Sequence, residues 1–257
     1  MLATRTEGPA DAPPLVLLHG LTETMRCWDR VVPLLAGRFR VVLVDLPGHG
    51  PSDGGGRGVA IESYADAVAE ALRREDVGPV AVAGHSLGGA IAIALAEASP
   101  ELGERIVLVN SPPTYDSRLT SRNGPERLMR QPVLGPVLWR AMPEKRMRDG
   151  FQLAFAPGYE VPPELFADLK DTPWNVFAGA TVALDAYLAE RDLGQRAAAL
   201  QVPVTVVFGD QDQRVDHGSL RVFDGVENAT VVRIPEAGHT PIWETPERAA
   251  ELIAGNG

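Results

Sequence analysis

The segment Gly84-His85-Ser86-Leu87-Gly88 places a serine between two glycines, directly after the apolar run Val80–Ala83 and directly before the small-residue run Leu87–Ala98. A strand that turns sharply into a helix lifts its corner residue above the edge of a sheet, and the flanking glycines let chain segments approach closely. The helix N-terminus behind the corner favours developing negative charge. The pattern therefore predicts Ser86 as a nucleophile.

A serine hydroxyl is a weak nucleophile until a neighbouring base takes its proton, and a third group must orient that base. His239 is the best-placed base, because it follows a predicted strand in a glycine-containing loop that can reach back over the sheet edge. Two aspartates, Asp210 and Asp212, compete for the orienting role, with Asp216 as a more distant candidate. The residue types therefore predict a Ser-His-Asp triad.

The remaining histidines are weaker candidates for the base. His19, His49 and His85 lie in glycine-rich turns, where we expect them to form local hydrogen bonds, and His217 lies just past the acidic loop. Cys27 is the single cysteine and has no motif around it, so no intrachain disulfide is possible. No His, Cys or Asp cluster has the spacing of metal ligands, and we expect neither a metal nor another cofactor.

The surrounding elements explain how these residues meet. Apolar runs of strand length alternate with helical patterns, which is typical of a mostly parallel sheet with helices on both faces. The predicted strands are Pro14–Leu18, Arg40–Val44, Val80–Ala83, Arg105–Val109, Val204–Phe208 and Thr230–Ile234. The predicted helices are Trp28–Leu35, Ile61–Arg74, Leu87–Ala98 and Thr245–Ala254, the last with Thr245 as N-cap.

One stretch breaks this alternation. Residues 112–191 contain no convincing parallel strand, and prolines recur between short helical patterns rich in Leu, Met, Phe and Trp. We interpret this stretch as a helical cap inserted into an α/β core formed by residues 1–111 and 192–257.

Along nearly its full length the chain resembles the α/β-hydrolase family. Besides the Ser86 segment, four segments match in order: His19-Gly20-Leu21, Asp45–Gly50, Gly209-Asp210-Gln211-Asp212 and Gly238-His239. The chain order Ser, Asp, His is the one this fold uses. The resemblance implies an α/β-hydrolase fold with Asp212 as the acid, since the family's acid usually stands three residues after the loop glycine.

The resemblance also implies the oxyanion hole, formed by the backbone N–H groups of Leu21 and Leu87. It gives Asp45–Gly50 a structural role. Asn110 occupies a place where some relatives keep an alternative acid, but an amide cannot carry that charge.

The composition of the chain indicates which kinds of partner and which cellular location to expect. The chain has 257 residues and a formal charge of −10, which disfavours a nucleic-acid partner. It contains no apolar run long enough to span a bilayer, and the N-terminus has no signal-peptide pattern. We therefore expect a soluble cytoplasmic protein without membrane contact.

The substrate pocket is expected under the cap. Trp139 of the cap, Trp28 after the oxyanion loop and Trp243 after His239 are candidate wall residues. Ligand sites are mostly apolar with few polar anchors, which favours a small, largely hydrophobic substrate. The cap's apolar residues are Leu128, Met129, Val133, Leu134, Val137, Leu138, Trp139, Met142, Phe151 and Phe155.

These features favour a serine hydrolase that cleaves an ester or related acyl bond. A carbon–carbon bond hydrolase or lyase, or a thioesterase or cyclase serving an acyl carrier protein, remains the alternative, because both would suit a basic cap. The basic side chains of this stretch are Arg118, Arg122, Arg127, Arg130, Arg140, Lys145, Arg146 and Arg148, which also fit an ordinary solvated face. A non-catalytic binding protein on the same fold is the remaining interpretation.

Overall fold

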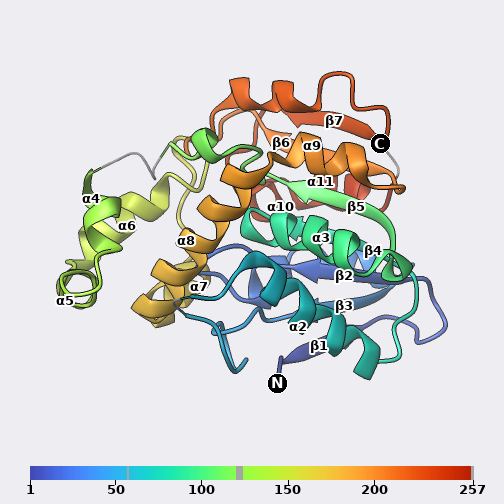
Figure 1. Cartoon of the computed structure of the whole chain (residues 1–257), viewed down its shortest axis with the longest axis horizontal. Coiled ribbons are helices and arrows are strands. Elements are labelled where there is room, and N and C mark those ends of the chain that lie inside the picture. Colours follow the sequence, from blue (N-terminus) through green and yellow to red (C-terminus); the bar gives the residue numbers. More distant parts are fainter. Residues whose placement is uncertain (57, 120–123, 256–257) are drawn as a thin grey trace.

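The computed structural model describes residues 1–56, 58–119 and 124–255. Its centre is a seven-stranded sheet with the order β1-β3-β2-β4-β5-β6-β7, in which only β1 runs antiparallel to its neighbour (Figure 1). The strands are β1 (Thr4–Glu7), β2 (Pro14–Leu18), β3 (Arg40–Val44), β4 (Val80–His85), β5 (Gly103–Val109), β6 (Val204–Gly209) and β7 (Ala229–Ile234).

All six strands expected from the apolar runs are confirmed, with ends shifted by at most two residues. The strand that the patterns do not indicate is β1, whose residues Thr-Arg-Thr-Glu form the sheet edge beside β3. An edge strand half exposed to water needs no apolar run, so the apolar criterion cannot find it.

The predicted helices α2 (Ile61–Arg74) and α3 (Leu87–Ala98) have the expected bounds. The predicted helix Trp28–Leu35 does not form as one continuous helix. The stretch 28–35 forms the 3₁₀ helix η1 (Met25–Trp28) and then α1 (Val32–Leu35), with Pro33 in the first turn of α1, where no N–H is needed. The other helices are η2 (Pro100–Leu102), η3 (Tyr115–Ser117), α4 (Gly124–Met129), α5 (Gly135–Ala141), α6 (Glu144–Gln152), α7 (Pro163–Asp171), α8 (Trp174–Glu190), α9 (Leu193–Ala199), η4 (His217–Phe223), α10 (Pro241–Glu244) and α11 (Pro246–Ile253).

Thr245 precedes α11 as expected, but its hydroxyl does not cap the helix. It donates a hydrogen bond to the carbonyl of Pro241 at 3.2 Å instead, because the short helix α10 ends immediately before it.

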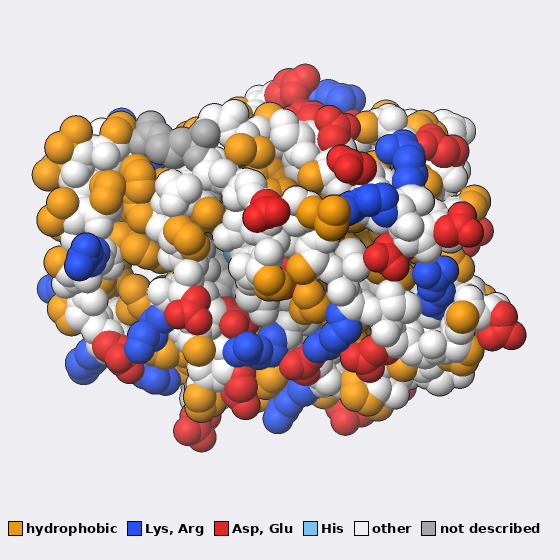
Figure 2. Space-filling model, turned by 90° about the horizontal axis from the view of Figure 1, so that it is seen from below, with side chains coloured by type: hydrophobic (Ala, Val, Ile, Leu, Met, Phe, Trp, Pro, Cys, Tyr) orange, Lys and Arg blue, Asp and Glu red, His pale blue; other side chains and the backbone are white. Residues whose placement is uncertain are grey.

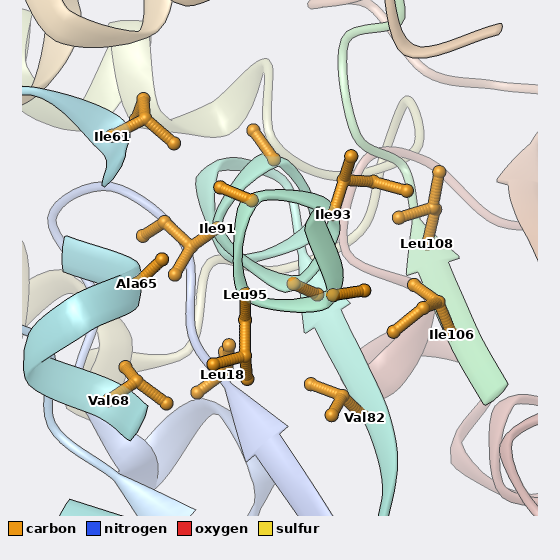
Figure 3. Packing of buried hydrophobic residues seen from close by; sticks show 14 of the residues in the cluster. Leu18, Ile61, Ala65, Val68, Val82, Ile91, Ile93, Leu95, Ile106 and Leu108 are labelled. Atoms are coloured by element: carbon orange, nitrogen blue, oxygen red, sulfur yellow. The ribbon is translucent and has the colours of Figure 1, made fainter. Parts of the chain in front are cut away.

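The core lies on both faces of the sheet because successive strand residues point to opposite sides. Val16 and Leu18 pack with α2, α3 and α8, whereas Leu15 and Leu17 pack with η1, α1 and α11. Figure 3 shows α3 end-on, with Ile91, Ile93 and Leu95 reaching toward α2 and the neighbouring strands. The almost entirely apolar sequence of α3 is thus explained by burial on all sides.

The predicted cap, residues 112–191, holds η3 and α4 to α8, and no element of the seven-stranded sheet falls among its described residues. Helices α4, α5 and α6 project at one end of the molecule (Figure 1). By contrast, Ala180, Leu184 and Leu188 of α8 belong to the main core cluster. The last helix of the predicted cap therefore also covers the sheet. Among the described residues, none of the helices is both long and apolar enough to cross a bilayer.

Candidate active site

Ser86 occupies the corner between β4 and α3, with φ 51° and ψ −112°. A non-glycine residue rarely adopts this conformation, and the neighbours leave no room for relaxation. A Cβ on Gly84 would lie 2.2 Å from the carbonyl oxygen of Gly88, and a Cβ on Gly88 would lie 2.4 Å from the carbonyl oxygen of Leu18. The two glycines of the motif are therefore required by backbone packing around Ser86.

The structure brings the three predicted triad residues together. His239 Nε2 lies 3.0 Å from Ser86 Oγ, and His239 Nδ1 lies 2.7 Å from Asp212 Oδ2. Asp212 and His239 are both buried. This connected chain of hydroxyl, imidazole and carboxylate has the geometry that allows proton transfer from the serine.

Burial and the partner charge act in opposite directions on both groups. Burial lowers the pKa of His239 and Asp212 raises it, with a net value below the usual 6.5. Burial raises the pKa of Asp212, but His239 and the hydrogen bonds to the carboxylate hold it below its ordinary value. At neutral pH the site therefore contains a carboxylate beside a neutral imidazole able to accept a proton.

The competing residues contact other groups. Asp210 pairs with Arg233, and Asp216 accepts a hydrogen bond from the backbone N–H of Gly218 at 3.1 Å, as the N-cap of η4. His217 Nε2 lies 3.0 Å from the backbone carbonyl of Asp212. Neither Asp210 nor Asp216 is in contact with His239. Cys27 is buried, and burial raises the pKa of its thiol well above the usual range, which opposes a nucleophilic thiolate.

Asn110, at the end of β5, contacts the acid directly. Its Nδ2 donates to Asp212 Oδ2 at 2.8 Å and to the Gly238 carbonyl at 3.2 Å, while its Oδ1 accepts from the Gly209 N–H at 3.2 Å. Asn110 is fully buried with φ 46°, a conformation that asparagine tolerates better than most residues. Sequence reasoning noted its place but missed this bridging contact.

A second buried network was not predicted. Glu23 Oε2 accepts the Gly20 N–H at 2.7 Å and lies 2.8 Å from His85 Nδ1, and His85 Nε2 lies 2.8 Å from the backbone carbonyl of His239. Burial lowers the pKa of His85, but Glu23 offsets this and leaves it above the usual 6.5. Burial raises the pKa of Glu23, but His85 brings it down to about 2. The network is thus an ion pair that joins three loops around Ser86.

His19 and His49 each form one local hydrogen bond, as expected, and that of His49 joins its Nδ1 to the Pro47 carbonyl at 3.2 Å, whereas His19 also bonds a distant turn. His19 Nε2 accepts the Leu46 N–H at 2.9 Å, so its Nδ1 carries the proton and donates to the Gly20 carbonyl at 2.7 Å. Burial and the neighbouring His49 lower the pKa of His19 to about 3. His19 is therefore a neutral structural group that links the Gly20 turn to the Asp45–Gly50 turn.

Two cavities meet near Ser86. The smaller one, of about 50 Å³, is lined by Ser86, His239, Leu21 and Leu87, among others, and we call it the nucleophile cavity. Both predicted oxyanion residues therefore border the same space as the serine. The larger one, of about 780 Å³, lies under α4, α5 and α6, and we call it the cap cavity. Hydrophobic side chains gather over this end of the molecule, beside a hollow in the surface (Figure 2).

The three tryptophans differ in their relation to these cavities. Trp139 lines the cap cavity, where its ring stacks on Phe177 with centroids 4.5 Å apart. Trp28 and Trp243 line neither cavity, in contrast to the expectation. They pack in the core cluster on the face of the sheet that α1 and α11 cover, because η1 and α10 direct them there.

The basic residues of the cap do not form one surface. Arg118 and Arg130 pair with Glu126 and Asp185, and this cluster ties α4 to α8. Lys145 pairs with Asp149 at 2.8 Å, and Arg122 lies outside the described residues. The exposed basic side chains for which we find no ion pair within the described part of the chain are Arg127, Arg140 and Arg146. Within the same residues, no group of three His, Cys, Asp or Glu side chains could hold a metal ion.

Comparison with known proteins identifies the family of the chain. The sequence model of the Alpha/beta hydrolase family matches residues 15–252. The chain is 30% identical to the pimeloyl-[acyl-carrier protein] methyl ester esterase of Nitrosomonas europaea, with 96% of this chain and 97% of the relative covered. It is 32% identical to the magnesium-chelatase 30 kDa subunit of Rhodobacter capsulatus, with 90% and 82% covered.

Solved structures give the same result. A hydrolase from Pseudomonas aeruginosa superposes with a TM-score of 0.81 at 25% identity, covering 99% of this chain and 94% of the other. The enol-lactonase from Burkholderia xenovorans superposes with a TM-score of 0.79 at 23% identity, covering 99% and 95%. The chain therefore belongs to the alpha/beta hydrolase family and is an enzyme of hydrolase type.

Proposed function

We propose that this hydrolase cleaves carboxylic esters of small, largely hydrophobic substrates through an acyl-enzyme formed on Ser86. The observation that carries the proposal is the chain of contacts from Ser86 Oγ to His239 Nε2 at 3.0 Å and from His239 Nδ1 to Asp212 Oδ2 at 2.7 Å. Relatives named as esterases support the same reaction class.

The proposed reaction has two halves. Ser86 Oγ attacks the ester carbonyl carbon while its proton passes to His239 Nε2, and Asp212 stabilises the imidazolium. The backbone N–H groups of Leu21 and Leu87 receive the oxyanion. The C–O bond to the alcohol then breaks, and the alcohol leaves with the proton from His239. In the second half a water molecule, deprotonated by His239, attacks the acyl-enzyme and releases the acid and Ser86.

The cap cavity supports a largely apolar substrate. Its volume of about 780 Å³ and its lining by Leu138, Trp139, Met142 and Phe177 suit a hydrophobic chain or ring. Because the cap cavity shares Leu21 and Phe151 with the nucleophile cavity, a substrate lying in it can extend toward Ser86.

Labelling with a fluorophosphonate probe tests the nucleophile. The wild-type protein should be labelled, and labelling should disappear in Ser86→Ala, with Ser117→Ala as a matched control at a buried serine outside both cavities. An unlabelled wild-type protein would favour the non-catalytic binding protein instead.

A substrate panel tests the bond that is cleaved. p-Nitrophenyl esters of increasing acyl length should be hydrolysed, with an optimum set by the cap cavity, and Ser86→Ala should abolish turnover. An acyl thioester and a vinylogous diketone belong in the same panel. Faster turnover of the diketone would replace ester hydrolysis by carbon–carbon cleavage.

A carrier-linked acyl ester is a second candidate substrate. Three relatives are named pimeloyl-[acyl-carrier protein] methyl ester esterases, and the cap exposes Arg127, Arg140 and Arg146. An acidic carrier would be attracted by these side chains. The methyl ester of a carrier-bound acid should then be hydrolysed with a lower KM than the free methyl ester, and Arg140→Glu should remove that advantage at low ionic strength. Equal KM values for the two substrates would exclude a carrier.

A further inference from the structure

Arg214 lies at the junction of the two cavities. It lines both of them, together with Leu21 and Phe151. Its place follows from the acid loop: Arg214 comes two residues after Asp212, and its backbone N–H donates to Asp212 Oδ1 at 2.7 Å. The side chain thus leaves the loop that positions the triad and enters the space that a substrate would occupy.

The guanidinium of Arg214 is poorly satisfied. Its Nη2 donates to the carbonyl oxygen of Gly150 at 3.2 Å, and its central carbon lies 5.8 Å from the Phe151 ring centroid. Its Nε is buried and has no hydrogen-bond partner. In the described part of the chain we find no carboxylate within 4.0 Å of it.

The acids that line these cavities are engaged elsewhere. In the nucleophile cavity, Glu23 pairs with His85 at 2.8 Å. In the cap cavity, Glu126 pairs with Arg118 at 3.0 Å and Asp149 pairs with Lys145 at 2.8 Å. An anionic ligand would therefore meet acids that are already compensated and two guanidiniums without a carboxylate among the described residues, that of the exposed Arg146 in the cap cavity and that of Arg214, which alone of the two also lines the nucleophile cavity.

A partly buried cation without a counterion loses hydration, which the Gly150 carbonyl and the Phe151 ring replace only in part because the Nε group has no partner. A guanidinium also offers a planar array of N–H donors that matches a carboxylate better than it matches a single carbonyl oxygen. We propose that Arg214 binds a carboxylate of the substrate, so that the preferred esters carry a free carboxylate as well as the scissile ester and an apolar chain. This proposal rests on the proposed ester hydrolysis and names the substrate class for the same site.

Two matched series test the proposal and show which side of the ester bears the charge. On the acyl side, monomethyl esters of C4 to C8 dicarboxylic acids are compared with methyl esters of monocarboxylic acids of equal length, by acid release. On the alcohol side, 4-acetoxybenzoate is compared with phenyl acetate. We compare the value of kcat/KM for the charged ester with that for the neutral ester in each series. In the series whose charge lies on the side that Arg214 binds, this ratio should fall at least tenfold in Arg214→Gln, mainly because the KM of the charged ester rises.

Two further variants make the result specific. Arg214→Lys should retain part of the preference, because it keeps the charge but not the planar donor array. Arg221→Gln removes an exposed arginine of η4 and should leave the ratio at its wild-type value. A ratio that is the same in Arg214→Gln as in the wild type, in both series, would overturn the proposal.

Binding to Ser86→Ala separates this proposal from the proposed reaction. Titration calorimetry should give a Kd for monomethyl adipate that rises at least tenfold when Arg214→Gln is added, with a smaller change for methyl hexanoate. This measurement requires no turnover, so it can support carboxylate binding even if the ester panel fails. An equal change for the charged and the neutral ligand, found with this pair and again with 4-acetoxybenzoate against phenyl acetate, would refute carboxylate recognition by Arg214 whatever the panel shows.

Discussion

His85 Nε2 lies 2.8 Å from the backbone carbonyl oxygen of His239, so the residue before the proposed nucleophile holds the loop that carries the proposed base. The other ring nitrogen of His85 contacts Glu23, which also binds the N–H of Gly20. One imidazolium and one carboxylate thus connect the Gly20 turn, the Ser86 corner and the His239 loop. We infer that this pair positions the site without touching the substrate's reacting atoms.

Replacing His85 should reduce both stability and turnover. His85→Ala leaves the buried Glu23 carboxylate without its partner, which should lower the free energy of unfolding by about 3 kcal/mol. The His239 loop also loses its contact, so kcat should fall at least tenfold with little change in KM. His85→Gln keeps one donor and should recover part of kcat. Urea unfolding and ester kinetics on the same preparations measure both effects. If the His85→Ala protein were destabilised but kept its kcat, the role of His85 would be structural only.

The pH dependence of this destabilisation identifies the ion pair. The pKa of His85 is above 6.5 in the folded protein, so its contribution is complete below pH 6.5 and is lost as the pH rises through the folded value. The gap in unfolding free energy between wild type and His85→Ala should therefore narrow toward alkaline pH. A gap that widens there would contradict a protonated His85.

The relation between sequence and site depends on how local each signal is. The strands β2 to β7 and the helices α2 and α3 are marked by continuous apolar runs or by helical periodicity, which tertiary packing reinforces. The Ser86 corner and the loops of Asp212 and His239 follow strands whose carboxyl ends meet at one sheet edge, so their proximity follows from a parallel sheet.

Other features depend on contacts between distant segments. The pairing of Glu23 with His85 spans 62 positions, and nothing in the run Leu-Thr-Glu-Thr indicates that this acid is buried. Trp28 and Trp243 follow the expected loops, but one turn of helix decides whether such a ring faces a cavity or the core. Whether the Arg214 guanidinium has a carboxylate partner likewise depends on which acidic side chains the fold brings near it.

Asn110→Asp tests the contact between Asn110 and the acid. Aspartate tolerates the positive φ of 46°, so the backbone should persist, but a second carboxyl group would lie next to Asp212. Two adjacent carboxylates resist ionising together, and any added negative charge raises the pKa of His239. The acid limb of kcat/KM against pH should therefore move to higher pH than in the wild type. A superimposable profile would show that Asn110 does not influence the triad.

Gly20→Ala tests the oxyanion loop. A Cβ at Gly20 would lie 2.8 Å from Glu23 Oε2 and 3.0 Å from His85 Nδ1, so either the turn before Leu21 or the buried Glu23–His85 pair that binds it must shift. Loss of one oxyanion donor typically costs about 2.7–4 kcal/mol of transition-state stabilisation, so a loss of kcat of about a hundredfold to a thousandfold with little change in KM is expected. Gly37→Ala is the control, because a Cβ there meets no atom within 4 Å. Equal kcat values for the two variants would argue against a role for this turn in the rate.

Asp212→Asn and Asp210→Asn separate the two aspartates of the acid loop. Only Asp212 contacts His239, whereas Asp210 pairs with Arg233. In triads of this kind the loss of the carboxylate charge lowers kcat by up to about 10⁴-fold. Asp212→Asn should therefore lose at least a hundredfold in kcat, while Asp210→Asn should change it by less than threefold. Ester kinetics measured in parallel compare the kcat of the two variants. If Asp210→Asn lost more activity than Asp212→Asn, the acid of the triad would be Asp210.

The pH profile of the wild type tests the state of His239. Because burial holds the pKa of His239 below 6.5 despite Asp212, kcat/KM should stay on its plateau at neutral pH and fall only as the pH drops through a midpoint below 6.5. In Asp212→Asn the carboxylate no longer raises that pKa, so the midpoint of the residual activity should move to still lower pH. Because a cation loses stabilisation when its anionic partner is removed, a midpoint that moved upward in Asp212→Asn would mean that Asp212 does not face the titrating base.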